Sequence, residues 1–145
     1  MMAASRSARS RGGPVSIVIG VLMSAAAVTL AVASLLHWGV AIPLGTATIS
    51  DPFRAAAIPE AVIAVVVGSG AVSVLTRRPP AWWLALAATV LGVLGTAYGL
   101  TVTVRRGQPG DIAYHVSLLS VLAAAAGLLL TPRARRELSD RSSVR

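Results

Sequence analysis

Apolar residues fill four long segments of the chain, and polar residues are confined mostly to the short stretches between them. The segments span residues 14–36, 55–75, 81–104 and 112–130, and each is bounded by charge, proline or glycine. About 20 mostly apolar residues in an α-helix cross the hydrocarbon core of a bilayer. The pattern predicts an all-α, polytopic membrane protein with four transmembrane helices in one bundle.

The composition agrees with this prediction. The apolar types AVILMFWYC make up 55% of the 145 residues and charged residues 12%, whereas charge takes about 25% of an ordinary soluble domain. Cysteine is absent, which excludes disulfides and thiolate chemistry. We expect one transmembrane domain, residues 14–131, between a basic tail of residues 1–13 and another of residues 132–145. These Ser/Arg-rich tails are expected to be disordered or to lie on anionic lipid headgroups.

The distribution of arginine predicts how the chain is oriented. The net charge of +8 is carried by arginine without lysine, and loops rich in arginine stay in the cytoplasm. One side of the predicted topology holds ten arginines: Arg6, Arg9, Arg11, Arg77, Arg78, Arg133, Arg135, Arg136, Arg141 and Arg145. The other side holds three: Arg54, Arg105 and Arg106. Both termini are therefore predicted to be cytoplasmic, in a multi-pass protein of the cell membrane.

Two further inferences come from the same residues. The arginines lie in short clusters between apolar runs with no aromatic residues interleaved, which argues against nucleic acid as a partner. A composition rich in alanine, glycine, valine and arginine and free of lysine is typical of a GC-rich bacterial genome. We therefore expect a bacterial plasma-membrane protein whose partners are the lipid bilayer and its anionic headgroups.

The first segment has a second interpretation, a cleavable signal peptide. A basic start precedes it, and residues 31–33 read AVA before Ser34. The apolar run continues through Leu35 and Leu36, however, and is longer than the 7 to 15 residues of an ordinary signal core. We favour a retained helix, and the later segments keep their direction in either case.

Small residues recur at helical spacing in all four segments. Close helix packing in lipid depends on such residues because no hydrophobic force draws helices together there. The glycines expected to serve packing are Gly68, Gly92, Gly95 and Gly99, of which the last two form a GxxxG. They predict packing within one bundle, and a homodimer or another membrane-protein partner is the alternative.

Tryptophan marks the predicted membrane boundaries. Trp38 follows the first segment, and Trp82 and Trp83 follow the sequence RRPP at the start of the third. An indole is favoured at headgroup depth. All three are interpreted as interfacial anchors.

The second segment carries polar residues near its start. Asp51 followed by Pro52 predicts a capped helix start, which places Pro59 inside the helix as a bend and Glu60 just inside the outer boundary. A helix start at Pro59 is the alternative. In the fourth segment Asp111 is predicted to be the N-cap, and His115 follows one turn later.

Glu60 and His115 are expected at similar depth, because the second and fourth segments run in the same direction, and the sequence leaves open whether they meet. Ionisable side chains inside a span are expensive and usually face the bundle interior or water. The candidate polar pocket comprises Glu60, His115, Tyr98, His37 and Tyr114.

Three interpretations of this pocket stay open. Glu60 can be an ordinary acid of a first helical turn, with His115 bonded to a nearby carbonyl. It can instead form a functional pocket with His115, or the two histidines can ligate a metal or haem. Only two histidines are present, both on one side, and zinc needs three or four ligands. We therefore expect no metal and no cofactor.

The layout is similar to that of small DoxX-like bacterial membrane proteins. The resemblance covers about residues 14–131 and is carried by four short spans, by AIPLGTATISDPFRAAAIPEAV before and into the second span, and by YHVSLL opening the fourth. Some members of that group are associated with membrane redox or quinone chemistry. The resemblance implies a four-helix bundle in which Glu60 and His115 are the positions of interest.

No motif for nucleotide binding, nucleophilic hydrolysis or zinc proteolysis occurs in the chain. The spans also lack the polar lining of a channel. We expect a protein without enzymatic activity that serves as an accessory or interaction protein of the plasma membrane. The alternative is a small-molecule or redox, quinone-related, module with an outward-facing Glu/His pocket.

Overall fold

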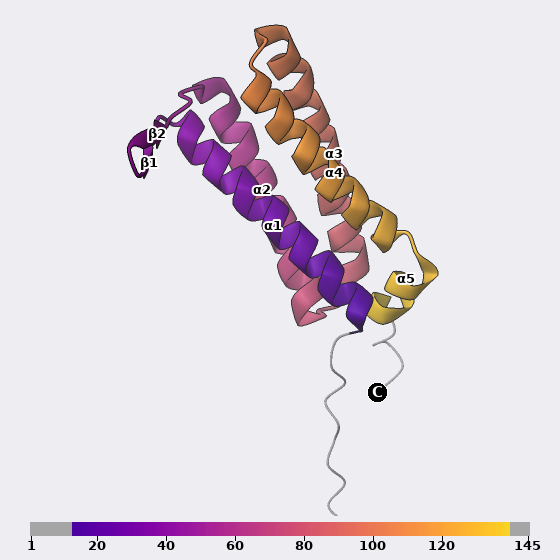
Figure 1. Ribbon diagram of the computed structural model, residues 1–145. Coiled ribbons are helices and arrows are strands. Elements are labelled where there is room, and N and C mark those ends of the chain that lie inside the picture. The colour runs from indigo at the N-terminus through magenta and orange to yellow at the C-terminus, as the bar shows by residue number, and fades with distance from the viewer. Residues whose placement is uncertain (1–12, 140–145) are drawn as a thin grey trace, which may run out of the picture.

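The computed structural model describes residues 13–139 and has an all-α architecture with one small hairpin (Figure 1). Its elements are α1 (Pro14–His37), β1 (Ile42–Leu44), β2 (Ala47–Ile49), α2 (Arg54–Thr76), α3 (Ala81–Arg106), α4 (Pro109–Leu129) and α5 (Pro132–Ser139). The first four helices are each long and apolar enough to cross a membrane. The chain is a multi-pass membrane protein, and the predicted four-helix bundle is confirmed.

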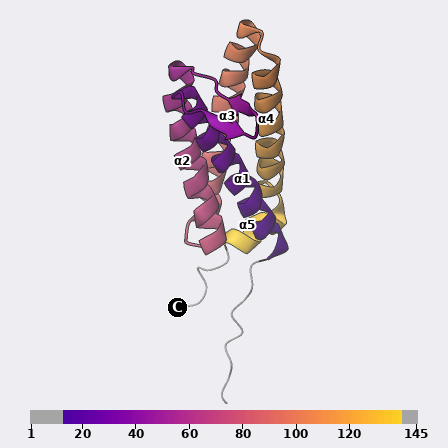
Figure 2. The same cartoon turned by 60° about the vertical axis from the view of Figure 1, so that its left-hand side comes forward.

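The four long helices form a ring. Helix α1 packs against α2 and α4, and α3 packs against the same two neighbours. Figures 1 and 2 show the hairpin at one end of this ring and α5 at the other. We call them the hairpin end and the arginine-rich end, since Arg77, Arg78 and the arginines of α5 lie at the second.

Two helix starts differ from the prediction. Helix α2 begins at Arg54 with Phe53 at its N-cap and no side-chain cap, so Asp51 is not the capping residue. Asp51 is engaged elsewhere, because its carbonyl oxygen accepts a hydrogen bond from His37. Helix α4 begins at Pro109, whose fixed φ suits the first turn, so Asp111 lies inside that turn rather than before it.

The hairpin of β1 and β2 was not predicted. Leu44 pairs with Ala47 in an antiparallel register, which leaves Gly45 and Thr46 as a two-residue turn. Gly45 has a φ of +61°, which glycine adopts without strain and which such tight turns require. The hairpin brings the chain from α1 to α2 across the hairpin end.

Helix α5 was also not predicted, and of the two alternatives for the tail, disorder is wrong for residues 132–139, whereas contact with anionic headgroups stays a prediction. Ala134 and Leu138, four residues apart, are buried against the bundle. Glu137 accepts a hydrogen bond from the backbone N–H of Ser16 at 3.0 Å and pairs with Arg133 at 3.1 Å. These contacts fix α5 beneath the start of α1. The remaining tail residues, 1–12 and 140–145, lie outside the described part of the chain.

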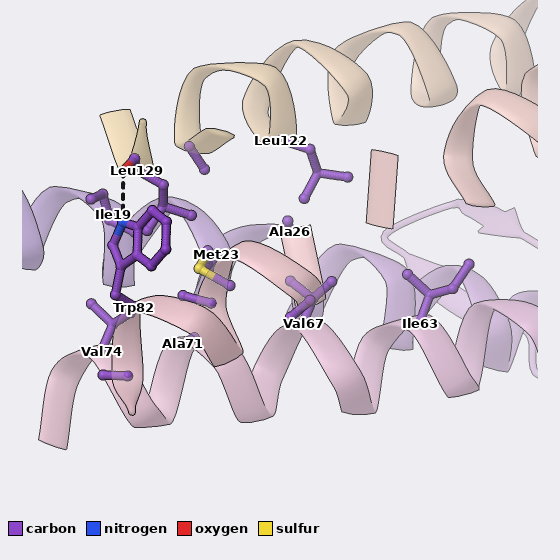
Figure 3. Packing of buried hydrophobic residues seen from close by; sticks show 14 of the residues in the cluster. Ile19, Met23, Ala26, Ile63, Val67, Ala71, Val74, Trp82, Leu122 and Leu129 are labelled. Atoms are coloured by element: carbon purple, nitrogen blue, oxygen red, sulfur yellow. Dashed lines mark hydrogen bonds between the residues drawn. The ribbon is translucent and has the colours of Figure 1, made fainter. Parts of the chain in front are cut away.

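The core runs along the ring axis and is built from small and branched side chains (Figure 3). Small residues permit the close approach of α2 and α3. A Cβ on Gly70 would lie 2.9 Å from the Ala88 Cβ and 3.4 Å from the Ala85 Cα. The backbones there are therefore too close for a larger residue.

The glycines singled out in the sequence also face neighbours within this chain. A Cβ on Gly92 would lie 3.0 Å from Val67, one on Gly95 would meet Ile63, and one on Gly99 would lie 2.6 Å from His115. Gly68 is packed less closely, since a Cβ there would lie 3.6 Å from the Ala27 Cβ. The GxxxG thus serves contacts inside the bundle.

The three tryptophans occupy different environments. Trp38 and Trp83 are exposed, as interfacial anchors would be. Trp82 is buried, and its indole N–H donates to the Leu129 carbonyl at 2.9 Å (Figure 3). The interpretation of Trp82 as an anchor is wrong, because the end of α4 offers a free carbonyl within reach and α5 places Arg135 over the ring.

Candidate functional site

All five candidate residues line one cavity of about 220 Å³ at the hairpin end of the bundle. The residues come from all four long helices: His37 from α1, Glu60 from α2, Tyr98 from α3, and Tyr114 and His115 from α4. The parallel course of α2 and α4 places Glu60 and His115 at related depths, as the sequence predicted.

The direct partner of Glu60 is His37. Glu60 Oε2 lies 3.4 Å from His37 Nε2, and both side chains are buried, with 9% and 5% of their surface exposed. No hydrogen bond or ion pair joins Glu60 to His115 within residues 13–139, so the contact that the sequence left open is not formed there. Glu60 contacts His37 because the last turn of α1 and the first turns of α2 meet at the hairpin end. The Phe53 N–H also donates a hydrogen bond to the His37 carbonyl there.

The hydrogen bonds of His37 define where its protons lie. Nδ1 is 2.9 Å from the carbonyl oxygen of Asp51, which can only accept, so Nδ1 carries a proton. Nε2 then faces a carboxylate oxygen. Whether the proton between them sits on nitrogen or on oxygen, the His37–Glu60 contact holds one proton.

His115 has the same arrangement. Its Nδ1 donates to the Asp111 carbonyl one turn earlier, at 2.8 Å, and its ring packs edge-on against Tyr114 at 4.8 Å between centroids. Its Nε2 points to the glycine surface of α3 at Gly99. In the neutral ring this nitrogen is an acceptor presented to the cavity.

Three buried polar atoms around this cavity make no hydrogen bond of ordinary geometry, although the Tyr114 hydroxyl interacts with the Glu60 carboxylate and Glu60 Oε2 lies 3.4 Å from His37 Nε2. They are Glu60 Oε2, Thr96 Oγ1 and the Tyr114 hydroxyl oxygen, and within residues 13–139 no other buried side-chain nitrogen or oxygen is unpaired. Their residues all line the cavity. A buried polar group without a partner is costly, so three around one cavity indicate a place built to receive polar atoms.

Sequence reasoning missed Thr96. A threonine inside a helix usually bonds back to the preceding turn, as Thr89 does to the Ala85 carbonyl at 2.7 Å. Thr96 makes no such bond although it is 3% exposed. The sequence feature that could have identified Thr96 as a site residue is its position between Gly95 and Gly99, on the packed face of α3.

Phe53 and its neighbours lie at the hairpin end of the cavity. Phe53 lines it there and packs edge-on against His37, with 5.9 Å between ring centroids. The guanidinium of Arg106, at the end of α3, lies over the Phe53 ring at 3.8 Å. This cation–π contact bridges the start of α2 to the end of α3.

The exposed lining residues lie on α2 and α3. They are Ala55 and Pro59 on α2 and Tyr98 on α3, whose surface is 73% exposed. At about 1.5 Å per residue, Pro59 lies about 8 Å along the helix from Arg54, and Tyr98 about 12 Å from Arg106. The mouth therefore opens sideways between α2 and α3, on a face that is turned to lipid in a membrane.

The chemistry of the lining limits what the cavity can hold. It contains Glu60 and Asp111 but neither lysine nor arginine. Within residues 13–139 no group of three or more histidine and acidic side chains is arranged to hold a metal ion. The walls between the polar groups are apolar and include Leu30, Ile63 and Leu118.

No protein-family model matches this chain, and no curated protein or solved structure matches it either.

Proposed function

We propose that this protein binds a small molecule of the bilayer in the cavity at the hairpin end. The observation that carries the proposal is the convergence of Glu60 Oε2 and the Thr96 and Tyr114 hydroxyls on one cavity, where none of the three buried atoms makes a hydrogen bond of ordinary geometry within the chain. A bundle whose only task is to hold four helices together gains nothing from such atoms, since each is costly without a partner. Ligand sites, by contrast, combine apolar walls with a few polar groups.

Membrane placement forms the second part of the proposal. Arg77, Arg78 and the three arginines of α5 lie at the end opposite the cavity. We infer that this arginine-rich end is cytoplasmic and that its exposed side chains meet anionic headgroups, which puts the cavity near the outer face of a bacterial plasma membrane. The exposed Trp38 and Trp83 fit this placement as anchors at the two interfaces.

The accessory role predicted from the sequence stays a prediction. The glycines that suggested a partner surface contact Ile63 and His115 inside this bundle. The cavity is therefore the better-supported basis for function.

The proposal is tested by asking whether a molecule co-purifies with the cavity. Ala56 lines the cavity and Ala25 is exposed on the outer face of α1, so Ala56→Phe fills the site and Ala25→Phe is its matched control. Mass spectrometry of protein purified from its own membranes should find a small molecule with wild type and Ala25→Phe that is lost with Ala56→Phe. Equal recovery from all three proteins, or no bound molecule in any, contradicts the proposal.

A further inference from the structure

The geometry points to a lipid-soluble, uncharged or cationic ligand, about one substituted ring in size, whose hydroxyl or amine head donates a hydrogen bond to the unpaired atoms of the cavity. This inference rests on the proposed function and names the class of ligand.

The requirement for a donor follows from the groups that face the cavity. An ionised Glu60 carboxylate and Nε2 of a neutral His115 can only accept hydrogen bonds, and the donors near Glu60 are His37 Nε2 at 3.4 Å and the Tyr114 hydroxyl, neither of which makes a hydrogen bond of ordinary geometry to it. The Thr96 and Tyr114 hydroxyls can donate or accept. A head that only accepts would compete with the Glu60 carboxylate for the hydroxyl hydrogens, whereas a hydroxyl or an amine supplies a further donor to the acceptors of the cavity.

The charge of the site excludes an anionic head. Of the titratable groups that face the cavity, Glu60 and Asp111 are acids, Asp51 is an acid beside His37, and the two histidines are the possible cations. His37 is already paired with Glu60. The Arg106 guanidinium stacks on Phe53 at the hairpin end and is not part of the lining. A carboxylate or phosphate would therefore be buried beside the acids Glu60 and Asp111, with His115 as its one possible counterion among the lining residues, which is costly.

The volume of the cavity and the position of its mouth limit the size and polarity of the rest of the ligand. About 220 Å³ exceeds the roughly 150 Å³ of an apolar cavity that holds benzene and falls below the roughly 300 Å³ at which sites for drug-sized molecules begin. The Phe53–Arg106 contact lies at the hairpin end of the cavity, and the exposed lining residues Pro59 and Tyr98 lie on the surface that we place in lipid. A molecule that enters there must first dissolve in the bilayer.

Pro59 contributes directly to this mouth. Proline has no N–H, so the carbonyl of Ala55, one turn earlier, loses its usual helical donor. Both residues line the cavity and both are exposed. The proline thus adds a backbone acceptor at the entrance, which again favours a ligand that donates.

The test uses four probes that share one body and differ in the head: 4-butylphenol, 4-butylbenzylamine, 4-butylbenzoate and butylbenzene. Binding to the full chain in lipid nanodiscs is measured as saturable binding at equal membrane concentration of each probe. We expect the phenol and the amine to bind at least about tenfold more tightly than butylbenzene, since each gains hydrogen bonds to buried groups. The benzoate should bind at least about tenfold more weakly than the phenol.

Two isosteric variants assign this selectivity to the cavity. Thr96→Val and Tyr114→Phe each remove one unpaired hydroxyl, and each should lower the preference for phenol over butylbenzene by about five- to tenfold. Butylbenzene binding should stay the same. Ser69→Ala removes a hydroxyl from the exposed face of α2 and should change neither value.

The outcomes separate the class of ligand from the site itself. Preference for the benzoate, or equal binding of the phenol and butylbenzene, overturns the inference while leaving the cavity as a binding site. Selectivity that persists in both Thr96→Val and Tyr114→Phe also overturns it. Saturable binding of none of the four probes, together with no co-purifying molecule, overturns the proposed function as well.

Discussion

The imidazole of His37 and the carboxylate of Glu60 face one another across the α1–α2 contact, with Nε2 and Oε2 3.4 Å apart. Because the other ring nitrogen donates to the Asp51 carbonyl, one proton lies between the two side chains. The pair is buried inside a bundle of mainly apolar helices. It explains how Glu60 is tolerated there, and it places an acceptor at the wall of the cavity.

Removing His37 should destabilise the fold strongly. His37→Leu leaves Glu60 buried without its partner, and removal of one member of a buried pair costs about 3–5 kcal/mol. The free energy of unfolding in mixed micelles measures the loss. The double variant His37→Leu, Glu60→Met replaces both members by apolar groups and should recover part of it. A double variant no more stable than His37→Leu alone would show that the pairing is not the cause.

Thr96 and Thr89 are both buried on α3 and differ in whether the hydroxyl is paired. Thr89→Val removes a hydroxyl that donates to the Ala85 carbonyl at 2.7 Å and should lower the free energy of unfolding by about 1 kcal/mol. Thr96→Val removes an unpaired hydroxyl and should be neutral or stabilising in the empty protein. Equal losses in the two variants would mean that Thr96 has an internal partner.

The contact between α5 and α1 should depend on pH. Burial opposes the ionisation of Glu137, but hydrogen bonds from the Ser16 N–H and Arg133 outweigh it and hold the pKa below its ordinary value of 4.5. A lowered pKa means that the contact stabilises the fold above pH 4.5 and that this stabilisation is lost as the pH falls through the pKa of the folded state.

Thermal unfolding measured against pH checks this prediction. Wild type should lose stability below about pH 4.5, and Glu137→Gln should show a smaller decrease over the same range. Identical pH profiles for the two proteins would exclude Glu137 as the group responsible.

The orientation of the bundle is tested with reporter fusions. A reporter joined after Arg78, in the turn between α2 and α3, should report a cytoplasmic location. One joined after Gly107, between α3 and α4, should report the opposite side. An extracytoplasmic signal from the first fusion or a cytoplasmic signal from the second contradicts the placement of the arginine-rich end in the cytoplasm.

The long helices were predictable because lipid imposes a simple rule on length and polarity. The predicted segments 14–36 and 55–75 correspond to α1 (Pro14–His37) and α2 (Arg54–Thr76) within one or two residues. Helix α5 followed no such rule, since residues 132–139 are polar apart from Ala134 and Leu138. The sequence features that indicate α5 are the four-residue spacing of Ala134 and Leu138 and the i,i+4 pair of Arg133 and Glu137.

The residues of the site could be identified from the sequence, but the contacts between their side chains could not. Ionisable and aromatic residues near one end of the spans indicated the five residues that line the cavity. Which of them meet depends on the rotation of each helix about its axis and on the hairpin that joins α1 to α2. Neither leaves a clear periodic signal, so the sequence left open whether Glu60 meets His115, and the contact of Glu60 with His37 was not predicted.

The most direct test of the account is the stoichiometry of 4-butylphenol binding in nanodiscs to wild type, Ala25→Phe and Ala56→Phe. The cavity between the four helices predicts one saturable site per chain in wild type and in Ala25→Phe, whose new ring faces lipid. It predicts binding at least about tenfold weaker in Ala56→Phe, because the new ring occupies the site. Unchanged binding in Ala56→Phe would contradict the claim that this cavity is where the protein receives its ligand.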